Sequence, residues 1–435
     1  MANLLHLTPH LGGGVGSVLT AICGGLAERT SWQQEIVSLE YANEFAKTWS
    51  DASGIEIQDE VPPDSIELHE KVQKADAVLL HFWNHPLLYQ FLHSFSGKTA
   101  RIAFWAHTNG HHPPYRFPDS VLEYPEIFVT TSAYSLQAPT IAPKSDTWKE
   151  EHLRVIHSTA GTANFDTIEP RPHTGFNVGY IGTVDYCKLH RDFLKICAAV
   201  DIPDVRFIIC GGDQHREIEQ EAAAMGLASR FDFRGKVSNV PEVLAELDVF
   251  AYPLSPENYG TGEQVLIEAM AAGVPQVVLD NGPEAFVVQN GETGVIAKDN
   301  SGFAMAIETL YKDAATRKQF ADASRKHAKT HFSLENEVNA WDEVLASLLT
   351  RPAKIGILPA EEGSPWQLFL LALGACQART LFESVATYSP QEVPEELLAE
   401  VRGLPEIFLG ATRGSFRHYE RFLQDPLLKF LREQI

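Results

Sequence analysis

PLSPENYGTGEQVLIEAMAAGVP, residues 253–275, is the stretch that says most about the fold of this chain. The apolar residues before it, 248–252, are predicted to form a strand that runs into a glycine-rich turn with one carboxylate. A helix then begins and places a second carboxylate, Glu268, beside Ala269 and Met270 on its apolar face. A strand, a tight loop with free backbone N–H groups and a helix N-terminus together favour an anionic ligand.

The same alternation of apolar strands and amphipathic helices runs along most of the chain. It predicts strands at residues 3–8, 35–39, 77–82, 100–105, 127–131 and 154–156, and again at 177–182, 206–212, 231–235, 249–252 and 276–280. Such alternation implies α/β domains with parallel sheets that are covered on both faces. Residues 167–175 are rich in proline and polar side chains and resemble a linker. We therefore expect Rossmann-like domains over residues 1–168 and 174–335 and a helical C-terminal extension over residues 336–435.

Composition limits the partners of the chain. A length of 435 residues allows two or three domains, and 44% hydrophobic with 21% charged residues is typical of a soluble globular protein. The net charge of −22 disfavours nucleic acid as a partner. A phosphate-binding site therefore has to be a local concentration of Lys, Arg and backbone N–H groups.

Cysteine usage and apolar patterning favour a cytoplasmic protein. The five cysteines are odd in number and form no C-x-x-C pair, which is typical of thiols in a reducing compartment. The N-terminus lacks the basic region and apolar run of a signal peptide. The longest apolar stretch, near residues 366–376, is shorter than the about 20 residues that span a bilayer. We expect no transmembrane segment.

Residues 253–275 resemble the donor-binding motif of glycosyltransferase family 4, retaining enzymes of the GT-B type. That family has Pro-Ser, two further residues, Glu-Gly-Phe-Gly, and then a helix with Glu-Ala-Met-Ala and Gly-x-Pro. The resemblance covers about residues 1–345. It implies two Rossmann-like domains facing a central cleft, the first for the acceptor and the second for a nucleotide-sugar donor. It also implies sugar transfer to a saccharide, lipid-linked or protein acceptor, without a metal or other cofactor.

The spacing of the glutamates leaves two alignments open. The family places its two glutamates eight residues apart, whereas Gly260 lies eight residues before Glu268. In the alignment we prefer, residues 257–260 take the place of Glu-Gly-Phe-Gly, and three extra residues precede the helix. The rival alignment gives the sugar-facing role to Glu263 instead of Glu257.

The resemblance also assigns the donor contacts. The loop residues expected at the donor are Tyr259, Gly260, Thr261 and Gly262. Glu268 is expected to bind the ribose hydroxyls, because a carboxylate accepts two hydrogen bonds from a vicinal diol.

Residues 182–188 resemble the family segment Gly-Arg…Lys-Gly, whose two cations neutralise the diphosphate. Lys188 matches the lysine, whereas Thr183 stands where the family has arginine. Arg191, one helical turn after Lys188, either supplies the missing charge or is a solvated surface residue. Two cations are expected because the departing diphosphate gains charge in the transition state.

The first domain offers a glycine loop and a histidine. Gly13 and Gly14 precede a predicted helix, and they either contact phosphate or acceptor or simply form a tight turn. Their spacing does not fit the dinucleotide pattern G-x-G-x-x-G, which disfavours a dehydrogenase. His107 follows a strand end and is expected to reach the donor sugar, although a lone histidine is often structural.

Other histidines also lie near strand ends, at positions 81, 85, 111 and 112. Without a cysteine or acidic residue at a recognised spacing, they predict no metal site.

Two further classes of function stay open. The altered glutamate spacing and Thr183 are compatible with a non-catalytic GT-B-like protein that binds a nucleotide sugar or a partner. A nucleotide-sugar epimerase or a phosphorylase on the same fold is the other enzymatic alternative.

Overall fold

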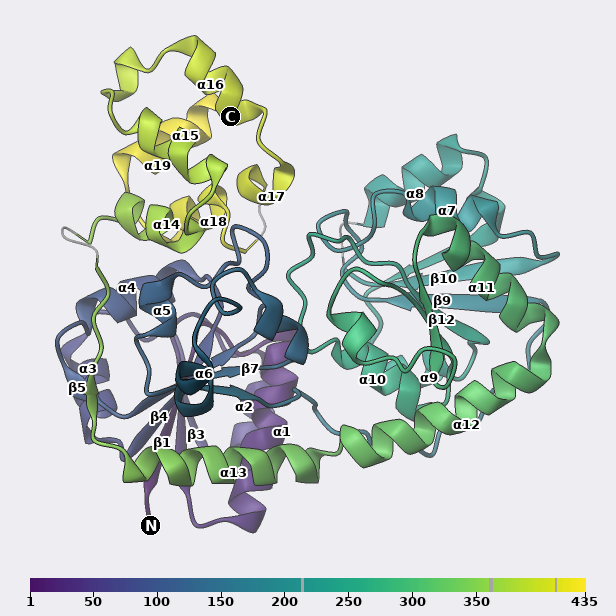
Figure 1. Ribbon diagram of the computed structural model, residues 1–435, viewed down its shortest axis with the longest axis horizontal. Coiled ribbons are helices and arrows are strands. Elements are labelled where there is room, and N and C mark those ends of the chain that lie inside the picture. The colour runs from purple at the N-terminus through teal and green to yellow at the C-terminus, as the bar shows by residue number, and fades with distance from the viewer. Residues whose placement is uncertain (213–214, 360–362, 411–412) are drawn as a thin grey trace. The chain divides into compact units, whose positions relative to one another are not determined.

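The computed structural model describes residues 1–212, 215–359, 363–410 and 413–435. The chain forms two compact units, each built around a parallel sheet (Figure 1). Unit 1 comprises residues 1–156 and 338–435, and unit 2 comprises residues 157–337. Within the described ranges, none of the helices is both long and apolar enough to cross a membrane.

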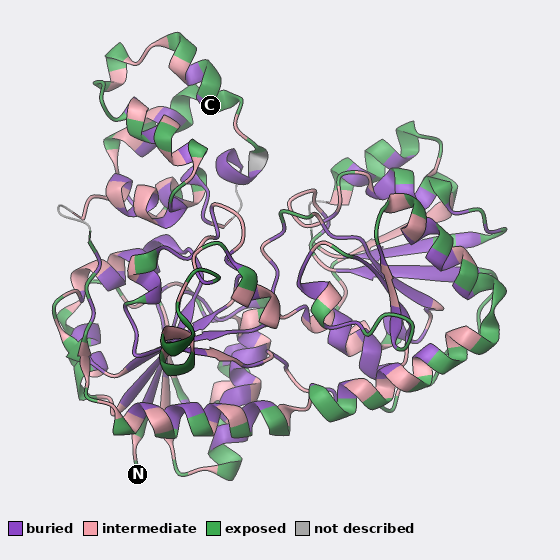
Figure 2. Ribbon diagram, in the orientation of Figure 1, coloured by how far each residue is buried: buried purple, intermediate pink, exposed green. Residues whose placement is uncertain are grey.

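The sheet of unit 1 is parallel, with the strand order β3-β2-β1-β4-β6-β7-β8. Its strands are β1 (Asn3–Thr8), β2 (Gln33–Ser38), β3 (Glu56–Gln58), β4 (Ala77–Phe82), β6 (Ile102–Ala106), β7 (Ile127–Thr130) and β8 (Leu153–Val155). The central strands are buried along their whole length (Figure 2), because helices cover both faces. The order reverses between β1 and β4, and sheets of this kind bind ligands at the carboxyl ends of the strands beside such a switch point.

The helices of unit 1 connect these strands and cover the sheet. They are α1 (Gly13–Arg29), α2 (Glu44–Ser53), α3 (Ile66–Lys74), α4 (Pro86–Ser94), α5 (Asp119–Leu122), the 3₁₀ helix η1 (Ala133–Gln137), α6 (Asp146–His152) and α13 (Leu334–Thr350). Several begin with a side-chain cap; Asn43, for example, accepts a hydrogen bond from the Ala46 amide at the start of α2.

Helix α13 begins in unit 2 and continues in unit 1, where it packs on the first sheet. Val338, Trp341 and Leu345 recur every three to four residues on one helix face and are buried. The Trp341 ring lies 4.7 Å from the Trp105 ring. A Cβ at Gly25 of α1 would overlap the Val338 side chain, so glycine permits the close approach of the two helices.

The C-terminal segment, residues 365–435, also belongs to unit 1. Its helices are α14 (Pro365–Leu373), α15 (Gln377–Val385), η4 (Pro390–Glu392), α16 (Glu395–Arg402), α17 (Glu406–Leu409), α18 (Phe416–Phe422) and α19 (Pro426–Gln434). Helices α14 and α18 contact α4, and the buried Asn84 amide donates to the Ala372 carbonyl at 3.0 Å. Before the segment, β15 (Lys354–Ile355) pairs with β5 (Thr99–Ala100). The observed units therefore differ from the predicted domains 1–168, 174–335 and 336–435, because α13 packs on the first sheet and the C-terminal segment packs on α4.

Unit 2 contains a six-stranded parallel sheet with the order β11-β10-β9-β12-β13-β14. Its strands are β9 (Phe176–Ile181), β10 (Val205–Cys210), β11 (Phe231–Gly235), β12 (Val249–Tyr252), β13 (Gln276–Leu279) and β14 (Gly294–Ala297). Its helices are α7 (Phe193–Ala199), α8 (His215–Ala224), η2 (Ala228–Arg230), α9 (Val240–Leu244), α10 (Gln264–Ala271), η3 (Pro283–Phe286), α11 (Asn300–Lys312) and α12 (Ala314–His331). The order reverses between β9 and β12, so the carboxyl ends of these two strands flank the second switch point.

Candidate functional site

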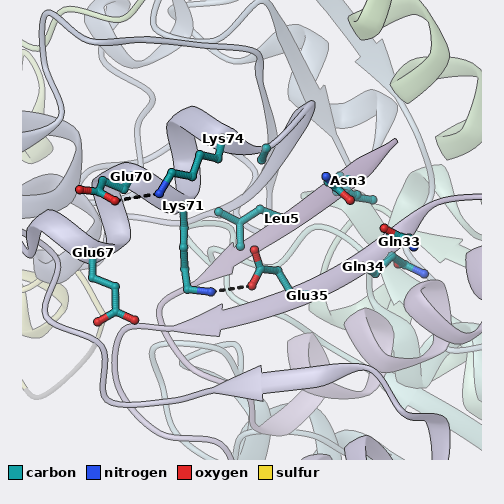
Figure 3. A pocket seen from close by; sticks show the side chains of 11 residues that line it. Asn3, Leu5, Gln33, Gln34, Glu35, Glu67, Glu70, Lys71 and Lys74 are labelled. Carbon is teal, nitrogen blue, oxygen red and sulfur yellow. Dashed lines mark hydrogen bonds and ion pairs between the residues drawn. The ribbon is translucent and has the colours of Figure 1, made fainter. Parts of the chain in front are cut away.

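A groove of about 480 Å³ in unit 1 lies at the amino ends of the sheet (Figure 3). Asn3 and Gln33, which begin β1 and β2, line it together with α3. Lys71 Nζ lies 2.8 Å from Glu35 Oε2, and a second lysine–glutamate pair lies on α3. Because these charges are paired and α/β sheets bind ligands at the carboxyl ends of strands, we place the candidate site at the opposite edge of each sheet.

A buried carboxylate–lysine pair lies at the carboxyl end of β12 in unit 2. Glu263 is 5% exposed, and its Oε2 lies 3.4 Å from Lys188 Nζ. The same oxygen accepts a 2.7 Å hydrogen bond from Tyr252 Oη. Burial disfavours the charge of Lys188, but Glu263, together with Tyr259 and Glu284, outweighs this effect, so the pKa of Lys188 is raised. The site therefore keeps a buried cation.

The loop before α10 folds so that Glu263 lies over its backbone. A Cβ at Gly260 would overlap Glu263 Oε1, so a side chain there would displace the Glu263 carboxylate. Glu263 itself has φ +41°, in the left-handed region, immediately before the first residue of α10. Non-glycine residues in this conformation are strained and cluster at functional positions. Glu263 Oε1 is buried and meets no hydrogen-bond partner among the described residues.

A second buried carboxyl, Glu284, lies near this pair. It belongs to η3 after β13 and is 0% exposed. In the described parts of the chain, neither of its oxygens has a hydrogen-bond partner. Burial and the nearby Glu263 carboxylate raise the pKa of Glu284 well above its usual range. The neutral carboxyl both donates and accepts hydrogen bonds, so ligand hydroxyls are suitable partners.

Glu268 lies one helical turn into α10 and is half-buried. Its Oε1 accepts a 3.1 Å hydrogen bond from Gln264 Nε2, and Gln264 Oε1 accepts one from the Ala160 amide at 3.0 Å. Burial raises the pKa of Glu268 to about 7, and the hydrogen bond from Gln264 partly opposes this. A diol bound to this carboxylate would favour its ionised form.

Glu257 lies elsewhere in the loop. It is exposed in a turn with Pro256, and its N–H donates to Ser255 Oγ at 3.3 Å. The preferred alignment gave Glu257 the sugar-facing role, yet it is Glu263 that the structure brings to Lys188. Glu263 does not lie free in an insert, because it directly precedes α10 and is buried.

The other predicted loop residues lie between these two glutamates. Gly260 and Thr261 are buried, and Tyr259 and Gly262 are half-buried. Gly262 packs beside Ser158, because a Cβ there would lie 3.2 Å from the Ser158 Cβ. The loop is thus mostly enclosed within unit 2.

The predicted cations behave differently from each other. Asp185 Oδ1 accepts hydrogen bonds from the amides of Cys187 and Lys188, which form a turn after β9 that holds the lysine backbone. Arg191 is exposed, and its Cζ lies 4.5 Å from the centre of the Tyr186 ring. The structure brings Lys188, but not Arg191, to the buried carboxylate.

In unit 1, three histidines form a hydrogen-bonded chain that ends at His107, directly after β6. His107 Nε2 lies 3.1 Å from His81 Nδ1, and His81 Nε2 lies 3.4 Å from His6 Nδ1. His6 Nε2 lies 3.1 Å from Gln34 Oε1. The Gln34 amide nitrogen donates to the Cys23 carbonyl at 2.9 Å, which fixes the orientation of that amide.

The hydrogen bonds between these three histidines determine the tautomer of His107. Burial lowers the pKa of His6 to about 4 and that of His107 to about 3, and it lowers the pKa of His81 well below its usual range. Because Gln34 Oε1 only accepts, the neutral His6 carries its proton on Nε2 and accepts at Nδ1. His81 therefore donates to His6 from Nε2 and accepts at Nδ1, and His107 donates to His81 from Nε2. Nδ1 of His107 is therefore a hydrogen-bond acceptor, suited to a hydroxyl.

Gly13 and Gly14 begin α1 at the carboxyl end of β1 and are exposed. Gly13 has φ +59°, which glycine adopts without strain. The preceding Gly12 caps the helix without a side chain, so ligand oxygens have access to first-turn N–H groups. Contact of Gly13 and Gly14 with a ligand stays a prediction.

Sequence reasoning assigned no ligand-binding role to Glu284, His6, Tyr252 or the C-terminal segment. A signal for His6 and His81 was present, since each is a polar residue within an otherwise apolar strand. The orphan carboxyl of Glu284 depends on burial and has no such signal. Within the described ranges, no three His, Cys, Asp or Glu residues form a group that could hold a metal ion.

Comparison with known proteins finds a sequence-family model that matches most of unit 2. Residues 163–327 match the model of the family described as Glycosyl transferases group 1. The lipopolysaccharide core biosynthesis glycosyltransferase LpsE of Rhizobium meliloti is 28% identical over 228 residues, 51% of this chain and 66% of the relative. The mannosyltransferase LpsB of the same species is 33% identical over 137 residues, 31% of this chain and 38% of the relative. The matches span between 38% and 66% of the length of these relatives.

Solved structures share the fold over more of the chain. HepE of Anabaena, in complex with UDP and glucose, superposes with a TM-score of 0.65 at 18% identity, covering 80% of this chain and 100% of that one. A glycosyltransferase from Rickettsia africae gives a TM-score of 0.65 at 14% identity, covering 80% and 99%. The prediction of the GT-B class, with two Rossmann-like domains and C-terminal helices, is confirmed.

Proposed function

We propose that this protein is a retaining glycosyltransferase that moves a sugar from a nucleotide-diphosphate sugar to a hydroxyl of a saccharide, lipid-linked or protein acceptor. The observation that carries the proposal is the buried Glu263–Lys188 pair at the carboxyl end of β12. It lies within the residues that match the Glycosyl transferases group 1 model. A cation fixed beside an orphan carboxylate oxygen suits a ligand that carries both phosphate and sugar hydroxyls.

Each polar group in unit 2 has a role in this proposal. Lys188 stabilises the charge that develops on the departing nucleoside diphosphate. Glu263 Oε1 and the neutral Glu284 carboxyl bind sugar hydroxyls, which satisfies their unpartnered oxygens. Glu268 binds the ribose diol. In unit 1, His107 Nδ1 accepts a hydrogen bond from a substrate hydroxyl.

Because Lys188 supplies the cation that a metal would otherwise provide, we propose that the reaction needs no metal or other cofactor. The net charge of −22 supports the exclusion of nucleic acid as a partner. The five free cysteines support a cytoplasmic site of action.

The proposal is tested by donor binding and turnover. Calorimetry with UDP, UDP-glucose and other nucleotide sugars identifies the donor, and release of the nucleoside diphosphate with an acceptor library measures transfer. In Lys188→Gln, affinity for the nucleoside diphosphate is expected to fall by ~1.5–3 kcal/mol, while affinity for the nucleoside stays unchanged. Arg191→Gln, which removes an exposed arginine from the same loop, is the matched control. Equal losses for nucleoside and diphosphate would refute the role of Lys188.

The second candidate function is nucleotide-sugar binding without turnover. Two observations favour it: Thr183 stands where glycosyltransferase family 4 has arginine, and Arg191 stacks on Tyr186. Lys188 therefore lacks the second cation that the family has at this place. Tight donor binding without sugar transfer or hydrolysis would select this candidate.

The retaining mechanism of the first proposal has a separate test. Inversion of the product's anomeric configuration, measured by NMR, would contradict it.

A further inference from the structure

Arg413, three residues before α18, lies at the carboxyl edge of the first sheet. Arg413 is half-buried, its Cζ lies 5.4 Å from the centre of the Trp83 ring, and its Nη2 lies 3.5 Å from His10 Nε2. The His418 ring nitrogen Nδ1 accepts a hydrogen bond from the Gly414 amide at 3.1 Å, which holds the backbone beside Arg413. Trp83 follows β4 and His10 follows β1, so Arg413 lies at the switch point of the sheet.

Arg413 lacks a carboxylate partner among the described residues. The acid of this region, Glu40, has other neighbours: Arg421 Nη2 lies 3.8 Å from its Oε1 and His85 Nε2 lies 3.7 Å from its Oε2. This region therefore has a net positive charge from Arg413, Arg421 and Glu40, although the whole chain has a net charge of −22.

The rings around Arg413 offer buried N–H donors, of which His85 Nε2 lies 3.7 Å from the Glu40 carboxylate, beyond hydrogen-bond distance. A guanidinium only donates, so His10 accepts at Nε2 and carries its proton on Nδ1. His85 accepts from the Leu87 amide at Nδ1 and carries its proton on Nε2. These two N–H groups and Trp83 Nε1 are buried without a hydrogen-bond partner in the described residues. The three ring centres lie within 6.5 Å of one another.

Unsatisfied buried N–H groups beside an unpaired guanidinium are complementary to a ligand that carries negative charge and only accepts hydrogen bonds. We propose that Arg413, with His10 and Trp83, binds an oxyanion, a phosphate or a carboxylate, carried by the acceptor substrate. The assignment of the anion to the acceptor substrate rests on the proposed glycosyltransferase function. The binding of an anion at Arg413 does not depend on that function. The C-terminal segment thereby completes a ligand site of unit 1.

Calorimetry of the full chain with inorganic phosphate and with malonate tests the anion site directly. The wild type and the control Arg417→Gln, which removes an exposed arginine of α18, are expected to bind the anion equally. Arg413→Gln should bind it at least about tenfold more weakly, and Arg413→Lys should be intermediate because it keeps the charge and loses the planar fork. Each titration is repeated in the Lys188→Gln background, so that phosphate binding at Lys188 in unit 2 is distinguished from binding at Arg413. Melting temperatures verify that every variant is folded.

The outcomes separate the sources of the anion and the two proposals. Preference for phosphate or for malonate identifies the group on the acceptor, and either supports the site. Equal affinity of Arg413→Gln and wild type, or no anion binding by the wild type, overturns it. A parallel loss of UDP affinity in Arg413→Gln overturns the assignment to the acceptor, because the arginine would then serve the donor. If no nucleotide sugar binds any variant while the anion still distinguishes Arg413, the proposed function fails and the anion site stands.

Discussion

Acidification should unfold unit 1 selectively, because its histidines are buried in the neutral form. Burial lowers the pKa of His6 to about 4 and the pKa of both His10 and His85 to about 3. In the unfolded chain a histidine titrates near 6.5. Between these values the unfolded chain binds protons that the folded chain does not, so the stability of the folded state falls as the pH falls.

The size of the effect follows from the three side chains, which are 0%, 7% and 1% exposed. Going from about pH 7.5 to about pH 5.5, each is expected to lower the free energy of unfolding by ~1.4 kcal/mol. Together these three lower it by ~4 kcal/mol, a large fraction of the stability of a typical domain, and the buried His81 and His107, whose pKa values are also lowered, add to the loss. The loss should be complete only once the pH has fallen below the lowered pKa values.

Tryptophan fluorescence isolates this effect, because all seven tryptophans lie in unit 1, at positions 32, 49, 83, 105, 148, 341 and 366. Urea unfolding followed at several pH values gives the free energy of unit 1 alone. His10→Phe should reduce the pH-dependent loss by ~1.4 kcal/mol, whereas His331→Gln in unit 2 should leave it unchanged. A change below ~1 kcal/mol over the same range would refute the reasoning, since these histidines would then be protonated in the folded state.

Three further changes test the site and the packing. Glu263→Gln should lower kcat by about 30- to 150-fold, whereas Glu257→Gln, at an exposed position, should change it less than about threefold; the reverse ranking in steady-state assays would restore the Glu257 alignment. His81→Phe should remove the partner that fixes the His107 tautomer, so ¹⁵N NMR should show mixed protonation of that ring and kcat should fall while donor affinity holds; an unchanged spectrum contradicts the relay. Trp341→Ala should destabilise unit 1 by ~3–5 kcal/mol in urea, because a buried ring against Trp105 is lost, and a loss under ~1 kcal/mol would argue against that packing.

Apolar periodicity predicted the strands because a strand in a covered parallel sheet must be apolar along its whole length. The strands β1, β4, β11 and β12 have the bounds predicted from sequence, and most of the others shift by only one or two residues. The short edge strands β3 and β14 and the two-residue strand β15 were missed, since two to four residues beside turns carry little periodicity. The glycine-rich motif likewise predicted the loop and helix α10, because glycine and helix-start signals act locally.

The choice between the two glutamates depended on tertiary structure. Both alignments are compatible with the sequence of the loop. Glu263 differs from the exposed Glu257 because Glu263 is buried beside Lys188 and Tyr252. The same holds for Glu284, whose sequence context is that of an ordinary helix start. The raised pKa of Glu284 comes from burial and from the Glu263 carboxylate, and a single sequence contains neither the burial nor that distance.

By itself, the sequence determined the α/β class, the repeated Rossmann-like pattern and the loop that carries the donor-site motif, because each follows from residues close together in the chain. Only the tertiary structure decided that α13 packs on the first sheet, that the histidines 6, 81 and 107 form one chain, and that Arg413 lies against His10, 403 residues away. Contacts of that separation are fixed by the packing of whole elements around the sheet. Local pattern selects the elements, and the burial of their apolar faces selects which side chains meet.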